Sequence, residues 1–154
     1  MSLIITRETA KVPKRLRPVL RRSELEVRYN TDFDQIIKEC QALHGGGWLT
    51  PELIEVYREV NRLGFGGTVA TYRDGQLAGG FWGVAVGGVL SIMSMFHNED
   101  HAGALALAAA AESLSGDGPW SVIDSVELNA NFARYGFTEI PIQKFVEHVL
   151  EGLR

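Results

Sequence analysis

The segment GTVATYRDGQLAGGFWGVAVGGVLSIMSMF, residues 67–96, predicts three consecutive antiparallel strands. Its first two runs are rich in strand-forming residues and are separated by the Asp74–Gly75 pair. An Asp-Gly dipeptide between two such runs is typical of a two-residue hairpin turn. The apolar run at residues 89–96 then continues the meander as a third strand.

Before the meander, the sequence predicts one strand and two helices. Residues 25–29 alternate between apolar and polar side chains, as in a half-buried strand. Thr31 is a predicted cap for a helix over residues 32–43, in which apolar residues recur at helical spacing. A second helix begins at Pro51 behind the cap residue Thr50 and ends at a glycine.

After the meander, the sequence predicts two helix–strand pairs and a closing helix. These elements lie at residues 102–114 (helix), 121–126 (strand), 127–136 (helix), 137–140 (strand) and 143–150 (helix). The complete order resembles that of the acetyltransferase-type (GNAT) fold, an α+β architecture in which helices flank a mixed sheet. Because one fold supports many activities, the function has to be argued from individual residues.

Length and composition indicate one domain without a membrane span. The chain has 154 residues, and no apolar run reaches the roughly 18–20 residues that a spanning helix needs. The N-terminus lacks the pattern of a secretory signal, so we expect a cytoplasmic location. Cys40 is the single cysteine, which excludes an intramolecular disulfide and predicts a buried thiol.

Charge is distributed unevenly along the chain. Residues 1–22 contain seven basic residues and one acidic residue, so they carry +6 while the other 132 residues carry −10. We therefore divide the chain into a basic arm, residues 1–22, and a single domain, residues 23–154. The arm either contacts a polyanionic partner or forms a solvated tail.

The turn after the third meander strand is unfavourable for coenzyme A. Proteins of the GNAT fold commonly hold the pyrophosphate of acyl-CoA on backbone amides at the start of the following helix. Here the sequence at residues 97–104 is HNEDHAGA, which places Glu99 and Asp100 near the expected phosphate position. Carboxylates also stabilise a helix N-terminus, and both explanations argue against a phosphate at this turn.

Several strings resemble the leucyl/phenylalanyl-tRNA–protein transferases and follow the order found in that family. GGWLTPELIEVYREVNRLG is similar to its G-T-W-I-T…A-Y…L-H-x-L-G segment, and DGQLAGGFWGVAVG to its D-G-x-L-V-G-G-x-Y-G-V-A-x-G hairpin. SMF matches the end of G-E-S-M-F, and VIDSVELNANFARYGFTEIPIQKF follows the family's closing stretch. RRSELEVRYNTDFDQIIKEC resembles its basic lead-in, strand and helix, so the resemblance covers roughly residues 14–150.

The resemblance implies a function. Enzymes of this family transfer Leu or Phe from a charged tRNA to a protein whose N-terminal residue is Arg or Lys, which marks that protein for degradation. The implied partners are an aminoacyl-tRNA and such an acceptor protein, with no cofactor, no metal and no membrane. The basic arm would then contact tRNA phosphates through Lys11, Lys14, Arg15, Arg17, Arg21 and Arg22.

The chain also departs from the family pattern. Met93 stands where the family has the Glu of G-E-S-M-F, and Val126 stands where it has the Gln of D-C-Q. Ala104 replaces a Lys of the helix after S-M-F, residues 140–143 replace I-P-R-R, and we expect the family's N-terminal lobe to be missing. These changes leave open a non-catalytic relative that binds aminoacyl-tRNA or N-terminal peptides, or a GNAT enzyme with another acyl donor.

Apolar residues are candidates for the pocket that receives the donor's side chain. Phe81, Leu90, Leu107 and Ile123 match pocket positions of the family, and we expect Met93, Met95 and Phe96 to line the same space between the sheet and the alanine-rich helix. Ordinary core packing is the alternative for each. Small residues nearby, including Gly79, Gly80 and Ala110, predict room for a ligand.

Polar and aromatic residues complete the predicted site. Ser94 is part of the S-M-F match, and Trp48 either stacks on the terminal adenine of tRNA or closes the edge of the core. Asp124 is predicted either to take a proton from the acceptor's α-amino group or to cap the next helix. Asn129 could supply polarity lost with the Gln. The four histidines show no pattern of metal ligands, so we expect no metal.

Overall fold

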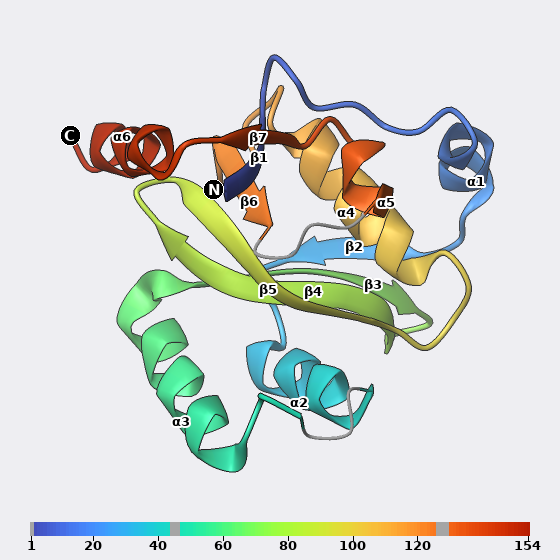
Figure 1. Ribbon diagram of the computed structural model, residues 1–154. Helices are drawn as coiled ribbons and strands as arrows, with labels where there is room; N and C mark the ends of the chain where they lie inside the picture. Colours follow the sequence, from blue (N-terminus) through green and yellow to red (C-terminus); the bar gives the residue numbers. More distant parts are fainter. Residues whose placement is uncertain (1, 44–46, 126–129) are drawn as a thin grey trace. The chain divides into compact units, whose positions relative to one another are not determined.

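The computed structural model describes residues 2–43, 47–125 and 130–154 (Figure 1). The chain falls into two compact units. Unit 1 consists of Met1–Ser23, Ala85–Ile92 and Ala108–Arg154, and unit 2 consists of Glu24–Val84 and Met93–Leu107. No helix within the described ranges combines the length and hydropathy needed to cross a membrane.

Unit 2 contains the predicted meander. Its strands follow the order β2-β3-β4-β5, where β2 is Glu26–Tyr29, β3 is Gly66–Arg73, β4 is Gln76–Val86 and β5 is Val89–His97. Strands β2 and β3, and likewise β3 and β4, are antiparallel. Asp74 and Gly75 both have positive φ, 50° and 81°, as the predicted hairpin turn requires.

Helices α2 (Phe33–Leu43) and α3 (Pro51–Val60) cover one face of these strands (Figure 1). The predicted cap of α3 is confirmed, because the Thr50 hydroxyl accepts a hydrogen bond from the Leu53 amide at 3.2 Å. A short π-helical turn, η1 (Asn61–Phe65), follows α3 and leads into β3. The core of unit 2 gathers Phe33, Ile36, Ile37, Cys40, Leu49, Ile54, Ala70, Tyr72, Trp82 and Phe96. The buried thiol predicted for Cys40 is confirmed.

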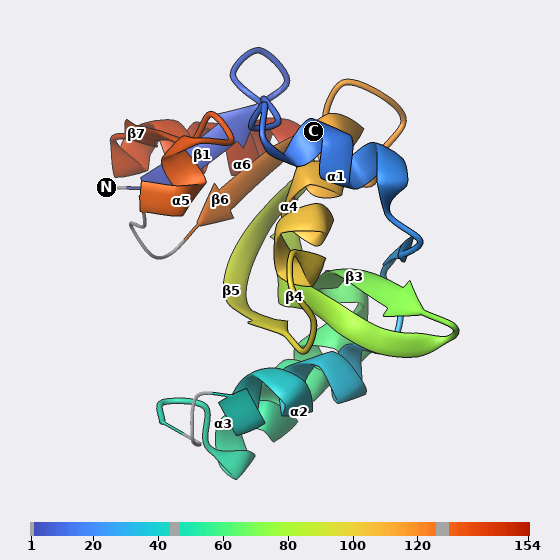
Figure 2. The same cartoon turned by 90° about the vertical axis from the view of Figure 1, so that its right-hand side faces the viewer.

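Unit 1 continues from the first half of β5 in the order β5-β6-β1-β7, where β1 is Ser2–Thr6, β6 is Val122–Ser125 and β7 is Thr138–Ile140. Strand β1 lies between β6 and β7 and is antiparallel to both (Figure 2), whereas β5 and β6 are parallel. The helices of unit 1 are α1 (Leu16–Arg22), α5 (Ala130–Ala133) and α6 (Ile142–Gly152). Helix α4 (Ala102–Ser113) belongs to unit 2 up to Leu107 and to unit 1 from Ala108.

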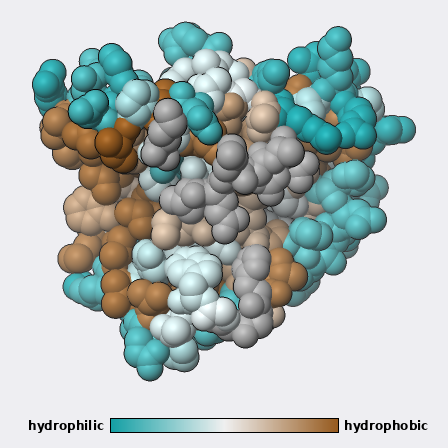
Figure 3. Space-filling view, in the orientation of Figure 1, coloured by the Kyte–Doolittle hydropathy of each residue, from teal (hydrophilic) through white to brown (hydrophobic). Residues whose placement is uncertain are grey.

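Helix α6 uses only part of its apolar surface for the core. Phe145 and Val149 pack with Ile140 on the buried cluster of Ile4, Val89 and Val122. The exposed hydrophobic residues of α6 and its C-terminal cap are Ile142, Val146, Leu150 and Leu153. Hydrophobic surface is visible at the upper left of the space-filling view, where α6 lies (Figure 3).

Strand β1 differs from the expectation for the basic arm, which assigned residues 1–22 to a segment outside the domain. Leu3, Ile4 and Ile5 are buried, with exposed fractions of 9%, 3% and 0%. An uncharged apolar run with a partner strand on each side is typical of an interior strand. The basic residues begin only after this strand, at Arg7, so the basic segment of the structure is residues 7–22.

Close packing of β4 against α4 leads to a testable prediction at Gly79. A Cβ on Gly79 would lie 2.7 Å from the Ala102 Cβ and 2.8 Å from backbone atoms of residues 102 and 103. Since overpacking of this kind costs about 1–3 kcal/mol, Gly79→Ala should lower the free energy of unfolding by that amount in urea denaturation. Gly116→Ala is the control, because a Cβ there meets no atom within 4 Å. Equal stability of the two variants would contradict the packing.

Candidate active site

Asp124 lies in the middle of the unit 1 sheet, on β6. Its register partners are Ser91 on β5 and Ile4 on β1. The side chain is buried, with an exposed fraction of 5%, and the Ser91 hydroxyl is hydrogen-bonded to its carboxyl group. Burying a carboxylate costs free energy unless the group is hydrogen-bonded or paired. The contact with Ser91 therefore offsets part of the cost of burying Asp124.

Burial also changes the acidity of Asp124. Desolvation raises the pKa of its carboxyl group above the usual 3.8, and the hydrogen bond from Ser91 opposes that rise only in part. When such a group is ionised, it is a stronger base than an exposed aspartate. The geometry therefore gives unit 1 a carboxylate suited to accepting a proton.

The predicted apolar residues of unit 1 lie on the opposite face of the sheet from Asp124. Successive side chains of a strand point to opposite faces, so Ile123 and Asp124 are separated in this way, as are Leu90 and Ser91. Leu90 and Ile123 are register partners and have an exposed fraction of 0%. Unit 1 thus places these two together in the core but not beside the Asp124 carboxyl.

In unit 2 the apolar residues predicted for the pocket lie in different environments. Phe81 and Leu107 are buried, with exposed fractions of 0% and 3%. Phe96 is part of the core that packs with α2 and α3, and the half-buried Met93 packs against the same core. The expectation that both residues line the space beside the alanine-rich helix is therefore corrected: they contribute to the core beneath α2 and α3.

Ser94 belongs to the same region of unit 2, since its side chain is hydrogen-bonded to the thiol of Cys40. Burial raises the pKa of that thiol to about 12, so Cys40 is held as an unreactive neutral group. Ser94 thus has a structural partner on α2.

The glycines near these residues serve close packing. A Cβ on Gly80 would lie 2.5 Å from the carbonyl oxygen of Val69, and a Cβ on Gly79 would lie 2.7 Å from the Ala102 Cβ on α4. Ala110 on α4 is fully buried. The expectation that these small residues leave room for a ligand is wrong at Gly79 and Gly80, because neighbouring backbone fills that space.

Trp48 is the exposed member of an aromatic group in unit 2. Its ring stacks on buried Trp82 with a centroid distance of 6.3 Å and an interplanar angle of 26°. Tyr57 contacts both rings edge-on, at 6.5 Å from Trp48 and 4.7 Å from Trp82. Trp48 is 46% exposed, so one face of a large aromatic ring is available for stacking.

The acidic turn between β5 and α4 is partly neutralised. The Nε–H of Arg73 on β3 donates a bifurcated hydrogen bond to the two carboxylate oxygens of Glu99, at 2.8 and 3.0 Å, and this pairing lowers the pKa of Glu99. The same guanidinium reaches Glu24 at 3.3 Å. Of the two carboxylates expected to repel a phosphate at this turn, Glu99 is thus paired with Arg73, which leaves the repulsion to Asp100.

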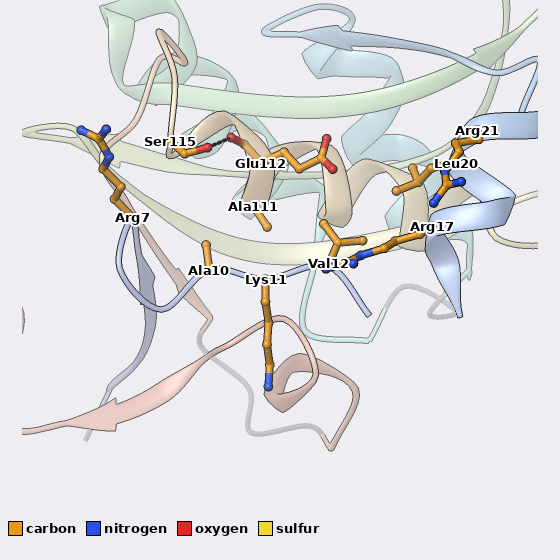
Figure 4. Close-up of a pocket in the computed structure, with 10 residues that line it drawn as sticks. All are labelled: Arg7, Ala10, Lys11, Val12, Arg17, Leu20, Arg21, Ala111, Glu112 and Ser115. Carbon is orange, nitrogen blue, oxygen red and sulfur yellow. Dashed lines mark hydrogen bonds between the residues drawn. The ribbon is translucent and has the colours of Figure 1, made fainter. Parts of the chain in front are cut away.

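A pocket of about 410 Å³ lies within unit 1, between the basic segment and the second half of α4. Figure 4 shows its charged lining: Arg7, Lys11, Arg17 and Arg21 from the basic segment, with Glu112 of α4. All four cations are exposed, and none forms an ion pair with any residue in the described ranges. The Lys11 side chain points away from α4 (Figure 4).

Three of the six predicted tRNA contacts line the pocket: Lys11, Arg17 and Arg21. Arg7 also lines it, although the sequence predicted no role for this residue. Lys14, Arg15 and Arg22 are exposed but do not line the pocket. Arg22 donates a hydrogen bond to the Pro18 carbonyl at 3.2 Å. The basic segment therefore carries two sets of charged side chains, one that lines the pocket and one that lies outside it.

Asn129 and Val126 lie outside the residues that the structure describes. In the parts of the chain that the structure describes, no group of three or more His, Cys, Asp or Glu side chains is arranged to hold a metal ion.

Comparison with known proteins then decides the family. The family described as leucyl/phenylalanyl-tRNA protein transferase matches residues 4–150. The chain belongs to this transferase family. The sequence-based prediction of the family is thereby confirmed, over a range that includes residues 4–6 of β1, the basic segment and Asp124.

Individual relatives agree. The leucyl/phenylalanyl-tRNA–protein transferase of Laribacter hongkongensis is 38% identical over 141 residues, covering 90% of this chain and 60% of the relative. Those of Chlorobium limicola and Gloeobacter violaceus are 31% and 33% identical and cover 94% and 91% of this chain. The chain spans 75% and 72% of the length of these two transferases.

Solved structures bear on the fold alone. A GCN5-related N-acetyltransferase from Kribbella flavida superposes with a TM-score of 0.54 at 15% identity, covering 89% of this chain and 52% of the other. A conserved protein of unknown function from Staphylococcus epidermidis gives a TM-score of 0.50 at 8% identity. The predicted α+β GNAT fold, a mixed sheet flanked by helices, is confirmed.

Proposed function

We propose that the protein transfers an apolar amino acid of the Leu or Phe type from an aminoacyl-tRNA to the N-terminus of a protein that begins with Arg or Lys. Membership of the transferase family supports this reaction class. The observation that carries the proposal is Asp124, a buried carboxyl group with a raised pKa within the matched range.

In the proposed reaction, the acceptor's α-amino nitrogen attacks the carbonyl carbon of the aminoacyl ester. The new C–N bond forms as the ester C–O bond breaks, and the tRNA leaves with its terminal hydroxyl restored. Asp124 accepts the proton that the attacking nitrogen loses, and this proton passes to the leaving oxygen. The ester is activated relative to the amide product, so the exchange needs no cofactor.

The basic segment, residues 7–22, is the proposed tRNA contact. Its exposed cations have no ion-pair partners among the described residues, so phosphates can approach them without displacing an internal carboxylate. We retain the division into this segment and a transferase domain, with the boundary at Ser23 and with β1 assigned to the domain. Since aminoacyl-tRNA is a cytoplasmic substrate, the proposal also places the protein in the cytoplasm.

Phe81, Leu90, Leu107 and Ile123 are proposed as contacts of the donor's side chain only through their family positions. All four are apolar and buried, which would exclude a charged donor side chain. Trp48 is the proposed stacking surface for the terminal base of the tRNA. Ser94, Met93 and Phe96 are proposed as substrate contacts only through their family positions, and Asn129 is proposed as a source of the polarity lost with the Gln.

A binding protein without transferase activity is the second candidate. The observation that favours it is Met93, which packs against the apolar core of unit 2 at the position where the family carries a Glu. A protein of this kind would bind aminoacyl-tRNA through the basic segment and would not consume it.

A transfer assay separates the two candidates. Leucyl- and phenylalanyl-tRNA with labelled amino acids are incubated with peptides that begin with Arg, Lys or Glu, and with an N-acetylated Arg peptide as control. The proposal predicts label only on the Arg and Lys peptides with free α-amino groups. Tight tRNA binding without labelled peptide would support the binding protein and reject the transferase.

Trp48 supplies a prediction about the donor. Stacking of a base on an aromatic side chain is worth about 1–3 kcal/mol, so Trp48→Ala should raise the KM for aminoacyl-tRNA by about 5- to 150-fold. Trp48→Phe retains a ring and should have a smaller effect. Since Trp48 is 46% exposed, the melting temperature should change little. An unchanged KM in the Ala variant would remove Trp48 from the proposed site.

A further inference from the structure

Ser91 and Asp124 occupy one face of the unit 1 sheet. They are register partners across the parallel pair β5 and β6, and each follows by two residues a valine of the buried apolar cluster, Val89 or Val122. Because side chains two apart in a strand share a face, Ser91 and Asp124 extend that face beyond the apolar cluster. These two polar side chains lie next to the apolar cluster on the same face of the sheet.

The surroundings of Asp124 are otherwise apolar. On its other side the register partner is Ile4, which is 3% exposed and belongs to the apolar cluster. Among the described residues, the Ser91 hydroxyl is the side-chain group that forms a hydrogen bond with the Asp124 carboxyl. A carboxylate has two oxygens and a serine hydroxyl has one hydrogen to donate, so Ser91 can donate to only one of the two oxygens at a time.

We propose that Ser91 is a positioning residue of the transferase: its hydroxyl donates to one oxygen of the Asp124 carboxylate and thereby directs the other oxygen toward the acceptor's α-amino group. This inference rests on the proposed function. Ser91 is less buried than Asp124, and both are held by β5–β6 pairing. A side chain on a paired strand is fixed in position more precisely than one on a loop, so it can orient its hydrogen-bond partner more precisely.

The role predicts a defined loss in Ser91→Ala. A hydrogen bond to a charged group is removed, so kcat should fall by roughly tenfold, while the KM for aminoacyl-tRNA stays unchanged. Since the hydrogen bond lowers the pKa of Asp124, its loss should raise that pKa and move the acidic limb of the pH–rate profile to higher pH. Ser91→Thr keeps the hydroxyl and should restore most of the rate.

The Asp124 pKa can be followed without any activity. Titration of the full chain carrying carboxyl-labelled aspartate, monitored by NMR, should show a higher pKa in Ser91→Ala than in the wild type and a near-normal value in Ser91→Thr. An identical pKa in all three proteins, or a slower Ala variant with an unchanged pH profile, would overturn the positioning role. Wild-type protein without transfer activity would reject the proposed function, whereas the titration would still report whether Ser91 acts on Asp124.

Discussion

Replacing Asp124 with Asn should lower the rate of aminoacyl transfer by about 10²–10⁴-fold, the range that a positioned general base contributes. Asn has nearly the same shape and can accept the hydrogen bond from Ser91, but it cannot take a proton at neutral pH. Single-turnover rates with saturating aminoacyl-tRNA would measure this loss. Binding of the tRNA should be unaffected, because the basic segment is the proposed source of that affinity.

The same variant should be at least as stable as the wild type at neutral pH. Burial raises the folded-state pKa of Asp124, so the folded protein binds this proton more tightly than the unfolded chain does. The wild type therefore loses stability as pH rises from the ordinary pKa near 3.8 through the raised folded value. The amide of the Asp124→Asn variant does not titrate, so the variant does not lose stability in this way. The free energy of unfolding of the variant relative to that of the wild type should therefore increase from acidic to neutral pH.

Asp117→Asn is the matched control, because Asp117 is exposed in the turn after α4. It should not change the transfer rate. A large loss of stability in Asp124→Asn, with transfer intact, would show that the carboxyl has a structural role instead. In that case the catalytic assignment would be wrong.

Removing charge from the basic pocket should weaken tRNA binding by a large factor. The variant replaces Lys11, Arg17 and Arg21 with Gln together. Each phosphate contact contributes about 0.9 to the slope of log affinity against log salt, so the slope should fall by about 2–3. At low salt the affinity should fall on the order of 10²-fold or more. Filter binding or fluorescence anisotropy across a salt series would measure both quantities.

Arg28, Arg58 and Arg62 make a matched triple control. Each pairs with a neighbouring glutamate, Glu26, Glu55 or Glu59, and so should offer little to a phosphate. Replacing these three with Gln should leave the salt slope near the wild-type value. Equal slopes for the wild type and the pocket variant would exclude the basic segment as the tRNA contact.

Local signals in the sequence predicted local structure well. The Asp74–Gly75 pair determines its own turn, and Thr50 with Pro51 determines the start of α3. Strand β1 was not predicted, because its short apolar run becomes a strand only through pairing with β6 and β7, more than one hundred residues away. Non-local pairing of this kind leaves no periodic signal in the strand itself.

The site was predicted less completely, for similar reasons. Asp124 was identifiable as a carboxyl in an apolar strand, but its partner Ser91 depends on the parallel register of β5 and β6. The stacking of Trp48 on Trp82 likewise joins residues from separate elements. Phe96 was assigned to the wrong surroundings because an apolar strand residue does not indicate which face it occupies.

The most direct test of the central claim is mass spectrometry of the acceptor peptide. The purified chain is incubated with phenylalanyl-tRNA and a peptide that begins with Arg, and fragment ions locate any added residue. The account predicts a single Phe linked to the α-amino group of that Arg, and almost none with Asp124→Asn. An unmodified peptide, with the tRNA bound but still charged, would contradict the claim that this chain is an aminoacyltransferase.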